Sequence, residues 1–206
     1  MFISFEGIDF SGKSTQVELL KEYLLSQNKE VKVIREPGGT QISEEIRNIL
    51  LSNNNIDMSI ETEIFLFSAS RAQLVREKIR TYLGKGIYVI SDRFFDSTTA
   101  YQGYGRKIPI ESVDHINRLA VGDTIPDITF FIDIPASLAE KRKAEKFKTL
   151  DRIENSESDF FERVRNGYLE LSKMENRFKV IDGTKKINEI HRDILKEILI
   201  LEERNN

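Results

Sequence analysis

The residues best suited to chemistry stand near the amino terminus, where residues 7–14 read GIDFSGKS. This is the pattern G-x-x-x-x-G-K-S of a phosphate-binding P-loop. Its glycines let the backbone curl, so that several N–H groups can point at one phosphate chain. Lys13 can then reach the β- and γ-phosphates, and the Ser14 hydroxyl can ligate Mg²⁺. The pattern therefore predicts a nucleotide, a metal ion and a phosphoryl-transfer reaction.

The flanking sequence supplies the strand and the helix that such a loop needs. Residues 2–5 form a short apolar run, and apolar residues recur at helical spacing from Val17 to Leu24. The amino terminus of that helix would also face the phosphates. The alternative is a glycine turn that carries an ordinary surface lysine. The predicted ATP-binding residues of the loop are Gly7, Ile8, Asp9, Phe10, Ser11, Gly12, Lys13, Ser14 and Thr15.

An acidic and a basic residue, Asp92 and Arg93, follow a second apolar run at residues 87–91. Ligands of open parallel sheets bind at the carboxyl ends of the strands. There Asp92 could hold Mg²⁺ or its water shell, and Arg93 could grip a phosphate with its planar fork. The simpler alternative is a salt bridge between neighbours at the end of a strand.

Two other segments contain groups that could bind the same ligand. Residues 35–40, REPGGT, turn sharply after another apolar run, and Thr40 can cap the next helix. Arg47 on that helix could face either the pocket or the solvent. Phe67 and Arg71 are four residues apart on a predicted helix and share one face, which offers a planar base both stacking and hydrogen bonds. An aromatic residue at helical spacing is, however, more often part of the core.

Two polar stretches further along could either bind a ligand or have only a structural role. Residues 96–103 offer hydroxyls, an amide and a phenol for a sugar and base, or they form a helix start with Asp96 as its N-cap. Residues 141–154 hold the densest basic cluster, with Arg142 and Arg152 among its cations. That cluster could close over the phosphates as a lid, or it could be a solvated helix face.

Composition limits the function classes further. The chain has 206 residues, 39% of them hydrophobic and 32% charged, with a net charge of −3 and no cysteine. A charge so near zero gives no global attraction to nucleic acid or to an anionic membrane. The absence of cysteine excludes disulfides and thiolate metal sites and fits a reducing interior. No signal peptide or membrane-spanning run is visible, so we expect a cytoplasmic protein.

The order of apolar runs predicts an α/β fold. Continuous runs that alternate with helical patterns indicate a five-stranded parallel sheet covered on both faces. We expect one domain over residues 1–206, with the segment before the third strand inserted to bind substrate. The predicted strands are 2–5, 31–34, 87–90, 128–134 and 178–181. The predicted helices are 14–27, 41–52, 61–83, 111–121, 137–147, 157–175 and 186–203.

Taken together, these segments resemble the bacterial-type thymidylate kinase family, whose members phosphorylate dTMP with ATP. The resemblance covers nearly the whole chain, and it is specific because many motifs stand in the same order and spacing. The motifs are the P-loop, residues 35–40, the Phe67–Arg71 pair, residues 92–94, residues 97–103, Pro126-Asp127 and LDRIE at 150–154. The resemblance implies the P-loop nucleoside monophosphate kinase fold, Mg²⁺ as cofactor, and a homodimer that could pack through helix 61–83.

The resemblance also implies roles for individual residues. Phe67 would stack on thymine, and Arg71 would bond its carbonyl edge. Arg93 would grip the dTMP phosphate with Arg47, while Asp9 would lie beside the acceptor sugar and phosphates. The implied dTMP-binding set is Glu36, Pro37, Arg47, Phe67, Arg71, Arg93, Ser97, Thr98, Tyr101 and Gln102. The implied catalytic set is Lys13, Arg93, Arg152 and Asp9, and the implied metal ligands are Ser14 and Asp92.

In the family that the chain resembles, a catalytic arginine comes either from the P-loop or from the lid, and the residue at position 10 distinguishes the two cases. Some relatives carry arginine there and many bacterial ones carry glycine, whereas this chain has Phe10. The lid would therefore supply the arginine, with Arg152 the first candidate and Arg142, also expected to bind ATP, the second. Two other functions remain open: a kinase for another pyrimidine monophosphate, and a P-loop protein that binds nucleotide without turnover.

Overall fold

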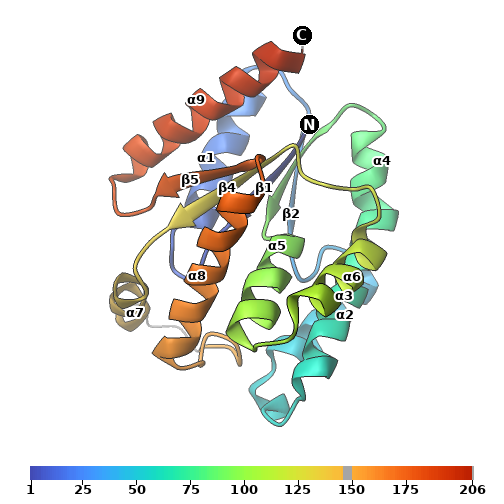
Figure 1. Ribbon diagram of the computed structural model, residues 1–206. Coiled ribbons are helices and arrows are strands. Elements are labelled where there is room, and N and C mark those ends of the chain that lie inside the picture. The colour runs from blue at the N-terminus through green and yellow to red at the C-terminus, as the bar shows by residue number, and fades with distance from the viewer. Residues whose placement is uncertain (146–149, 206) are drawn as a thin grey trace.

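The protein is described by a computed structural model over residues 1–145 and 150–205. Within these residues a five-stranded sheet has the order β2-β3-β1-β4-β5, and all its neighbouring strands are parallel (Figure 1). The strands are β1 Phe2–Glu6, β2 Val31–Arg35, β3 Tyr88–Asp92, β4 Ile128–Asp133 and β5 Phe178–Asp182. Each falls on a predicted apolar run, so the α/β prediction is confirmed.

Helices connect the strands and form the outer layers. The helices are α1 Lys13–Ser26, α2 Gln41–Leu51, α3 Ile60–Leu74, α4 Arg80–Leu83, α5 Phe95–Thr98, α6 Ile110–Val121, α7 Ala136–Ala144, α8 Ser158–Met174 and α9 Ile187–Asn205. A 3₁₀ turn η1 spans Asn53–Asn55, and two π-helical segments are η2 Val75–Ile79 and η3 Thr99–Gly105. The predicted helix 61–83 is thus a continuous run of α3, η2 and α4.

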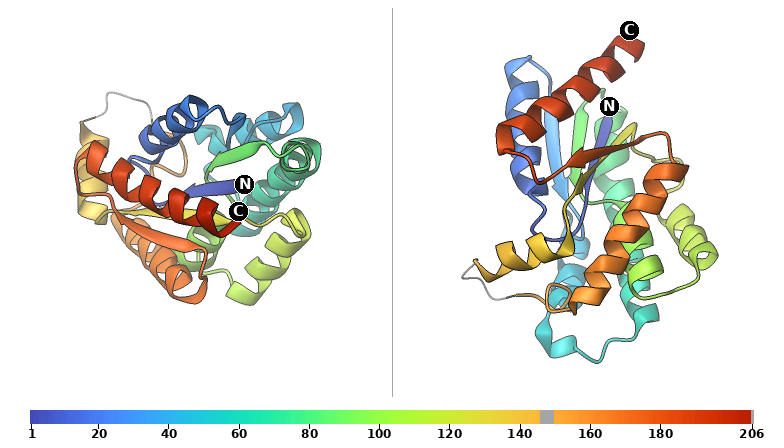
Figure 2. Two further views of the ribbon diagram at one scale, coloured as in Figure 1. Left: turned by 90° about the horizontal axis from the view of Figure 1, so that it is seen from above. Right: turned by 60° about the vertical axis from the view of Figure 1, so that its left-hand side comes forward.

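The sheet is covered on both faces, which explains its continuous apolar strands. Helices α1 and α9 lie on one face, and α8, α5 and α6 lie on the other (Figure 2). Side chains of β1 alternate between the two layers. Ile3 and Phe5 pack in the cluster with α1 and α9, whereas Phe2 packs in the cluster with α3 and η2. A strand buried on both sides needs apolar residues at nearly every position.

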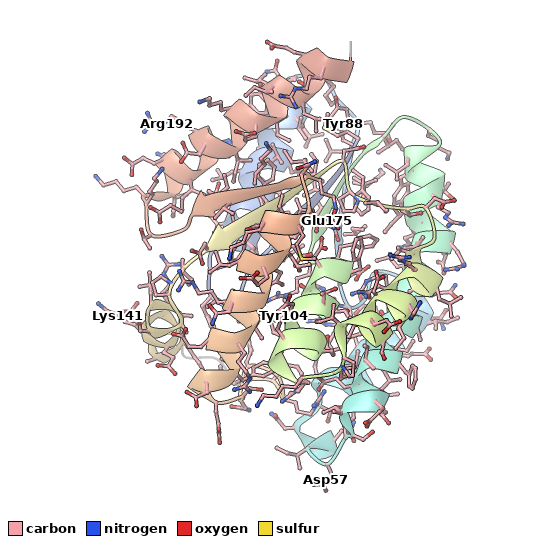
Figure 3. The ribbon with its side chains drawn as sticks, in the orientation of Figure 1. Asp57, Tyr88, Tyr104, Lys141, Glu175 and Arg192 are labelled. Carbon is pink, nitrogen blue, oxygen red and sulfur yellow. The ribbon has the colours of Figure 1, made fainter. Side chains whose placement is uncertain are left out.

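One helical region was expected only as an alternative, and it lies against α8. Residues 95–105 form α5 and η3, which agrees with the helix start that was the alternative for residues 96–103. Asp96 does not cap this helix, because its carboxylate accepts from Arg177 at 2.7 and 2.8 Å. The packing is close: a Cβ added to Gly167 of α8 would lie 2.7 Å from the ring of Tyr104, which Figure 3 labels between the two helices.

The segment after β4 differs in length from the prediction of a helix over 137–147. Helix α7 ends at Ala144. Residues 146–149, which include Lys146 and Lys148 of the predicted lid, lie outside the described residues. No helix in the described part of the chain is long and apolar enough to cross a membrane. The chain termini lie at the end of the molecule opposite α2, α3 and α7, which gather near the carboxyl ends of the strands (Figure 1).

Candidate active site

A cavity of about 680 Å³ opens at the carboxyl ends of the strands, within the size range of small-molecule sites. It brings together most predicted site residues from segments far apart in the sequence. The lining includes Asp9, Phe10, Ser11, Gly12, Lys13, Ser14, Thr15, Glu36, Pro37, Arg47, Phe67, Arg71, Asp92, Arg93, Ser97, Thr98, Tyr101, Gln102 and Arg142. Gly7, Ile8 and Arg152 do not line it.

The P-loop has the backbone conformation that its sequence predicts. Gly7 has φ of 143°, and a Cβ there would come within 2.7 Å of the Ile132 carbonyl oxygen. Gly12, with φ of 98°, directly precedes α1, so the first N–H groups of that helix open into the cavity. Phe10 also has a positive φ, 63°, a region that favours glycine. Its side chain is half-buried, and its backbone follows the path of the loop.

Lys13 holds the P-loop together in this structure. Its Nζ donates to the carbonyl oxygens of Gly7 at 3.0 Å and Ile8 at 2.8 Å. Burial, together with repulsion from Arg93, lowers the pKa of Lys13 to about 8. Because burial has already removed much of its hydrating water, the Lys13 ammonium is stabilised more by a bound phosphate than a fully hydrated ammonium would be. Lys13 is therefore placed to move from backbone carbonyls to phosphate oxygens.

Ser14, in the first turn of α1, lies beside Asp92, the last residue of β3. The Ser14 hydroxyl donates to Asp92 Oδ2 at 2.6 Å. A hydroxyl and a carboxylate are the hard oxygen donors that Mg²⁺ prefers, and Mg²⁺ completes its shell with water and phosphate oxygens. The pair therefore fits a nucleotide-bound Mg²⁺. Within the described residues, no group of three or more His, Cys, Asp or Glu side chains could hold a metal ion by itself.

Arg93 links the P-loop to the opposite wall of the cavity. Its guanidinium donates to Gly7 O at 2.8 Å, to Asp9 Oδ1 at 2.7 Å and to Tyr101 OH at 3.0 Å. Burial works against ionisation of Asp9, but the charges of Arg93 and Lys13 outweigh it and lower the pKa of that carboxyl. The result is a fixed pair of opposite charges beside Lys13. An anion that enters here meets Arg93 already oriented.

A buried network holds Arg71 at the other end of the cavity. Its Nε donates to Glu36 at 2.6 Å, and its two terminal nitrogens donate to Thr98 Oγ1 at 2.9 Å and the Phe94 carbonyl at 3.2 Å. The side chains of Arg71 and Glu36 are each 2% exposed. Burial raises the pKa of Glu36 to about 7 despite the neighbouring Arg71 charge. Phe67 also lines this end, so a flat ring and a donor edge meet there.

The two lid candidates occupy different places. Arg142 lines the cavity and donates to Phe10 O at 3.1 Å and to Ser11 O at 3.3 Å. Arg152 is buried instead: its Nε donates to Leu50 O at 2.9 Å, and its Nη2 lies 2.7 Å from Glu63 Oε2. The catalytic role of Arg152 stays a prediction, and it would require Arg152 to leave Glu63.

Comparison with known proteins identifies the family. The family model described as thymidylate kinase matches residues 5–194. A thymidylate kinase of Kosmotoga olearia is 52% identical over 201 residues, covering 97% of this chain and 96% of the relative. One from Thermosipho africanus is 52% identical over 194 residues, covering 94% and 95%. One from Chlorobaculum tepidum is 47% identical over 207 residues, covering 96% of each. The chain belongs to the thymidylate kinase family.

Membership in the thymidylate kinase family agrees with the fold and with the order of motifs along the cavity. The cavity also has lining residues that the sequence analysis did not predict. Past the P-loop, the lining includes Gly183, Lys185, Ile187 and Ile190, which follow β5 or begin α9. Chain order alone could have indicated this wall, because Gly183 and Thr184 directly follow the last strand and so lie at the ligand-binding edge. Arg142 Nη2 donates to Gly183 O at 3.2 Å and joins this wall to the P-loop.

Proposed function

We propose that this member of the thymidylate kinase family transfers the γ-phosphoryl group of ATP to dTMP, giving ADP and dTDP for dTTP synthesis. One observation carries the proposal: a single cavity joins the P-loop to a second set of base- and phosphate-binding side chains. Phe67 and Arg71 suit a pyrimidine with a 4-carbonyl group, and Arg93 suits its phosphate. A protein that only bound one nucleotide would need no second set.

The proposed reaction needs positioning and charge neutralisation more than proton transfer. An oxygen of the dTMP phosphate attacks the γ-phosphorus in line, and the bond from that phosphorus to the bridging oxygen breaks, leaving ADP. Because the attacking phosphate is already ionised, no general base is required. Lys13 and Arg93 would neutralise charge on the transferring and accepting groups. Mg²⁺, held by Ser14 and Asp92 with the ATP phosphates, would neutralise the charge that develops on the leaving group.

The nucleotide positions follow from this arrangement. ATP phosphates would occupy the P-loop, and the adenine would lie toward Gly183, Lys185 and Ile187. The dTMP phosphate would lie at Arg93 with Arg47, whose Nη1 donates to Pro37 O at 2.8 Å. In this proposal residues 1–206 form one kinase domain, and residues 141–154 act as a lid that excludes water from the bound nucleotides.

We also propose a homodimer. Large apolar side chains of α2, α3 and α6 are exposed, among them Phe65 at 60% and Leu119 at 79%. Such residues are usual at interfaces between copies of a chain. Sedimentation equilibrium should give a particle of twice the chain mass, and a particle of single chain mass at micromolar concentration would contradict this.

A substrate panel tests the proposed activity. ADP formation would be measured from ATP and Mg²⁺ with dTMP, dUMP, UMP, dCMP and dGMP supplied separately. We expect rapid turnover with dTMP and much slower turnover with the others. Turnover with a different pyrimidine monophosphate would keep the chemistry and change the substrate. Tight ATP binding without turnover of any acceptor would instead support a non-catalytic nucleotide-binding protein.

The two lid arginines should differ in their effect. Arg142→Ala should lower kcat at least about tenfold, because Arg142 stands at the P-loop where charge develops, with little change in KM for dTMP. Arg152→Ala should lower kcat less, since Arg152 is held at Glu63. Steady-state rates of the two variants would decide. A larger loss of kcat in Arg152→Ala would show that Arg152 moves to the phosphates during turnover.

The lowered pKa of Lys13 predicts a pH dependence. Below about pH 8 the Lys13 ammonium is charged, and above it the free protein loses this charge. The value of kcat/KM for ATP should therefore fall by about tenfold per pH unit above that pKa. The kcat of the ATP-bound protein should persist to higher pH, because bound phosphate raises the pKa again. Initial rates from pH 6 to 10 would test this, and equal alkaline limbs in both parameters would contradict it.

A further inference from the structure

The amide of Gln102 can present either of two chemical faces to the cavity. Gln102 lies on η3, lines the cavity and is 1% exposed. A primary amide carries a carbonyl acceptor at one end and two N–H donors at the other. The end that faces the ligand decides which base edge it can bind. The groups that hydrogen-bond to the amide fix which end this is.

Glu63 is the partner that orients this amide. Gln102 Nε2 donates to Glu63 Oε1 at 2.9 Å, and Glu63 is 1% exposed on α3. Two arginines also point at the same carboxylate. Arg106 Nε lies 3.2 Å from Oε1, and Arg152 Nη2 lies 2.7 Å from Oε2. Three donors thus converge on this one buried acid of α3: Gln102 and Arg106 from η3 and its C-cap, and Arg152 from the segment before α8.

The charge state of Glu63 removes the alternative orientation. Burial alone would raise its pKa, but Arg106, the Gln102 amide and Arg152 outweigh burial and lower it. Glu63 is therefore ionised at neutral pH, and an ionised carboxylate can only accept hydrogen bonds. The NH₂ end of Gln102 must face it. The carbonyl oxygen of Gln102 is then the end left for a ligand in the cavity.

Arg71 and Gln102 together present a hydrogen-bond donor and a hydrogen-bond acceptor to the base. Arg71 can only donate, and Gln102 Oε1 can only accept. Thymine and uracil present a 4-carbonyl acceptor beside an N3–H donor, which complements this pair. Cytosine presents the reverse, a 4-amino donor beside an unprotonated N3. A site with fixed polar groups rejects a ligand that leaves those groups unpaired.

We propose that Glu63 is a specificity-determining positioning residue: by holding the Gln102 amide with its carbonyl toward the acceptor base, it makes the site select pyrimidines that carry N3–H beside a 4-carbonyl group. The inference rests on the proposed function, because it concerns the acceptor pocket of that reaction. Glu63 touches neither the base nor the reacting phosphates and acts through Gln102.

Glu63→Gln tests this role with a nearly isosteric change. Arg106 and Arg152 can only donate, so the new amide would turn its carbonyl oxygen to them and its NH₂ group to Gln102. Gln102 would then rotate and present N–H groups to the base. We expect the ratio of dissociation constants for dCMP and dTMP, measured by calorimetry, to fall at least about tenfold. Glu170→Gln, which changes an exposed acid on α8, should leave the ratio unchanged.

A double-variant comparison separates positioning from general stabilisation. Gln102→Met removes the amide and should also lower the ratio. Adding Glu63→Gln to Gln102→Met should lower it no further if Glu63 acts through Gln102. Loss of stability or release of Arg152 would weaken the binding of dCMP and dTMP equally, so the ratio of their dissociation constants would not change. An unchanged ratio in Glu63→Gln, or equal additional losses in the double variant, would overturn the proposal.

A measurement on the unsubstituted protein covers the case in which Glu63→Gln does not fold. The side-chain amide protons of Gln102, assigned by NMR against Gln102→Met, should exchange slowly with solvent, because they face a buried carboxylate. Rapid exchange in the free protein would place them in the cavity and overturn the proposal. Failure of the proposed function is distinct, since the unsubstituted protein would then not turn over dTMP whichever way Gln102 faces.

Discussion

Lys13→Ala should lower kcat for dTMP phosphorylation at least about 1,000-fold. Lys13 is the P-loop cation, and its Nζ lies 2.8 Å from Ile8 O at the turn of the loop. In phosphoryl transfer most of the rate comes from positioning and electrostatic stabilisation, so removal of one preorganised cation costs about as much as removal of an oxyanion-hole donor or more. The measurement is kcat at saturating ATP and dTMP.

Lys21→Ala is the matched control for Lys13→Ala. Lys21 lies two turns further along α1, and its exposed ammonium pairs with Glu18 at 2.8 Å, so its loss should leave kcat unchanged. Lys13→Ala also removes the hydrogen bonds from Nζ to the carbonyl oxygens of Gly7 and Ile8, so the melting temperature of the variant is measured beside its kcat to establish that it is folded. Near-normal kcat in a folded Lys13→Ala protein would refute the P-loop role.

Arg93→Ala should lower kcat/KM for dTMP about 100- to 1,000-fold. Arg93 is the side chain that ties Gly7, Asp9 and Tyr101 together, and it has φ of 74° at the end of β3. Its removal would take away the acceptor-phosphate cation and leave the Asp9 carboxylate unpaired in a buried site. Loss of one preorganised group that stabilises the transition state costs about 2.7–4 kcal/mol in comparable sites, which corresponds to the expected fall in kcat/KM. Initial rates at varied dTMP and saturating ATP would measure the effect.

Arg93→Lys separates charge from geometry in this prediction. Lysine keeps the positive charge but lacks the planar fork, so we expect about half of the loss, on a logarithmic scale, to be recovered. Arg118→Ala, which removes an exposed arginine paired with Asp114 on α6, should change neither kcat nor KM for dTMP. If Arg93→Ala raised KM for ATP and left dTMP kinetics intact, Arg93 would belong to the donor site.

Much of the fold could be predicted because its signals are local. A strand buried on both faces needs an apolar run, and an amphipathic helix needs apolar residues at helical spacing. Both signals are confined to a few neighbouring residues. All five strands therefore lie on predicted runs, and Thr40 caps α2 as expected, its side chain accepting from Ser43 N. The helix over 95–105 was predicted only as an alternative, because its stability comes from packing against α8 and from the Asp96–Arg177 ion pair.

The placement of the cavity residues was predictable for a similar reason. In a parallel sheet the loops after each strand share one edge, so motifs after β1, β2 and β3 had to meet there. Arg47 was ambiguous on sequence grounds, and its bond to Pro37 O, together with its place in the lining, shows that it faces the cavity. The wall beyond β5 followed the same rule but lacked a recognisable motif.

The amino-acid sequence alone was enough to indicate the P-loop, the α/β sheet and the family, because each depends on the type and spacing of neighbouring residues. It could not indicate which partner each charged side chain takes. Arg142 reaches Phe10 O across 132 positions, and Gln102 reaches Glu63 across 39. Such pairs form only when the folded chain brings them together, since a polar or charged group that loses water must find a hydrogen-bond partner within reach. That requirement, and no local pattern, places Arg152 at Glu63 and turns the Gln102 carbonyl toward the cavity.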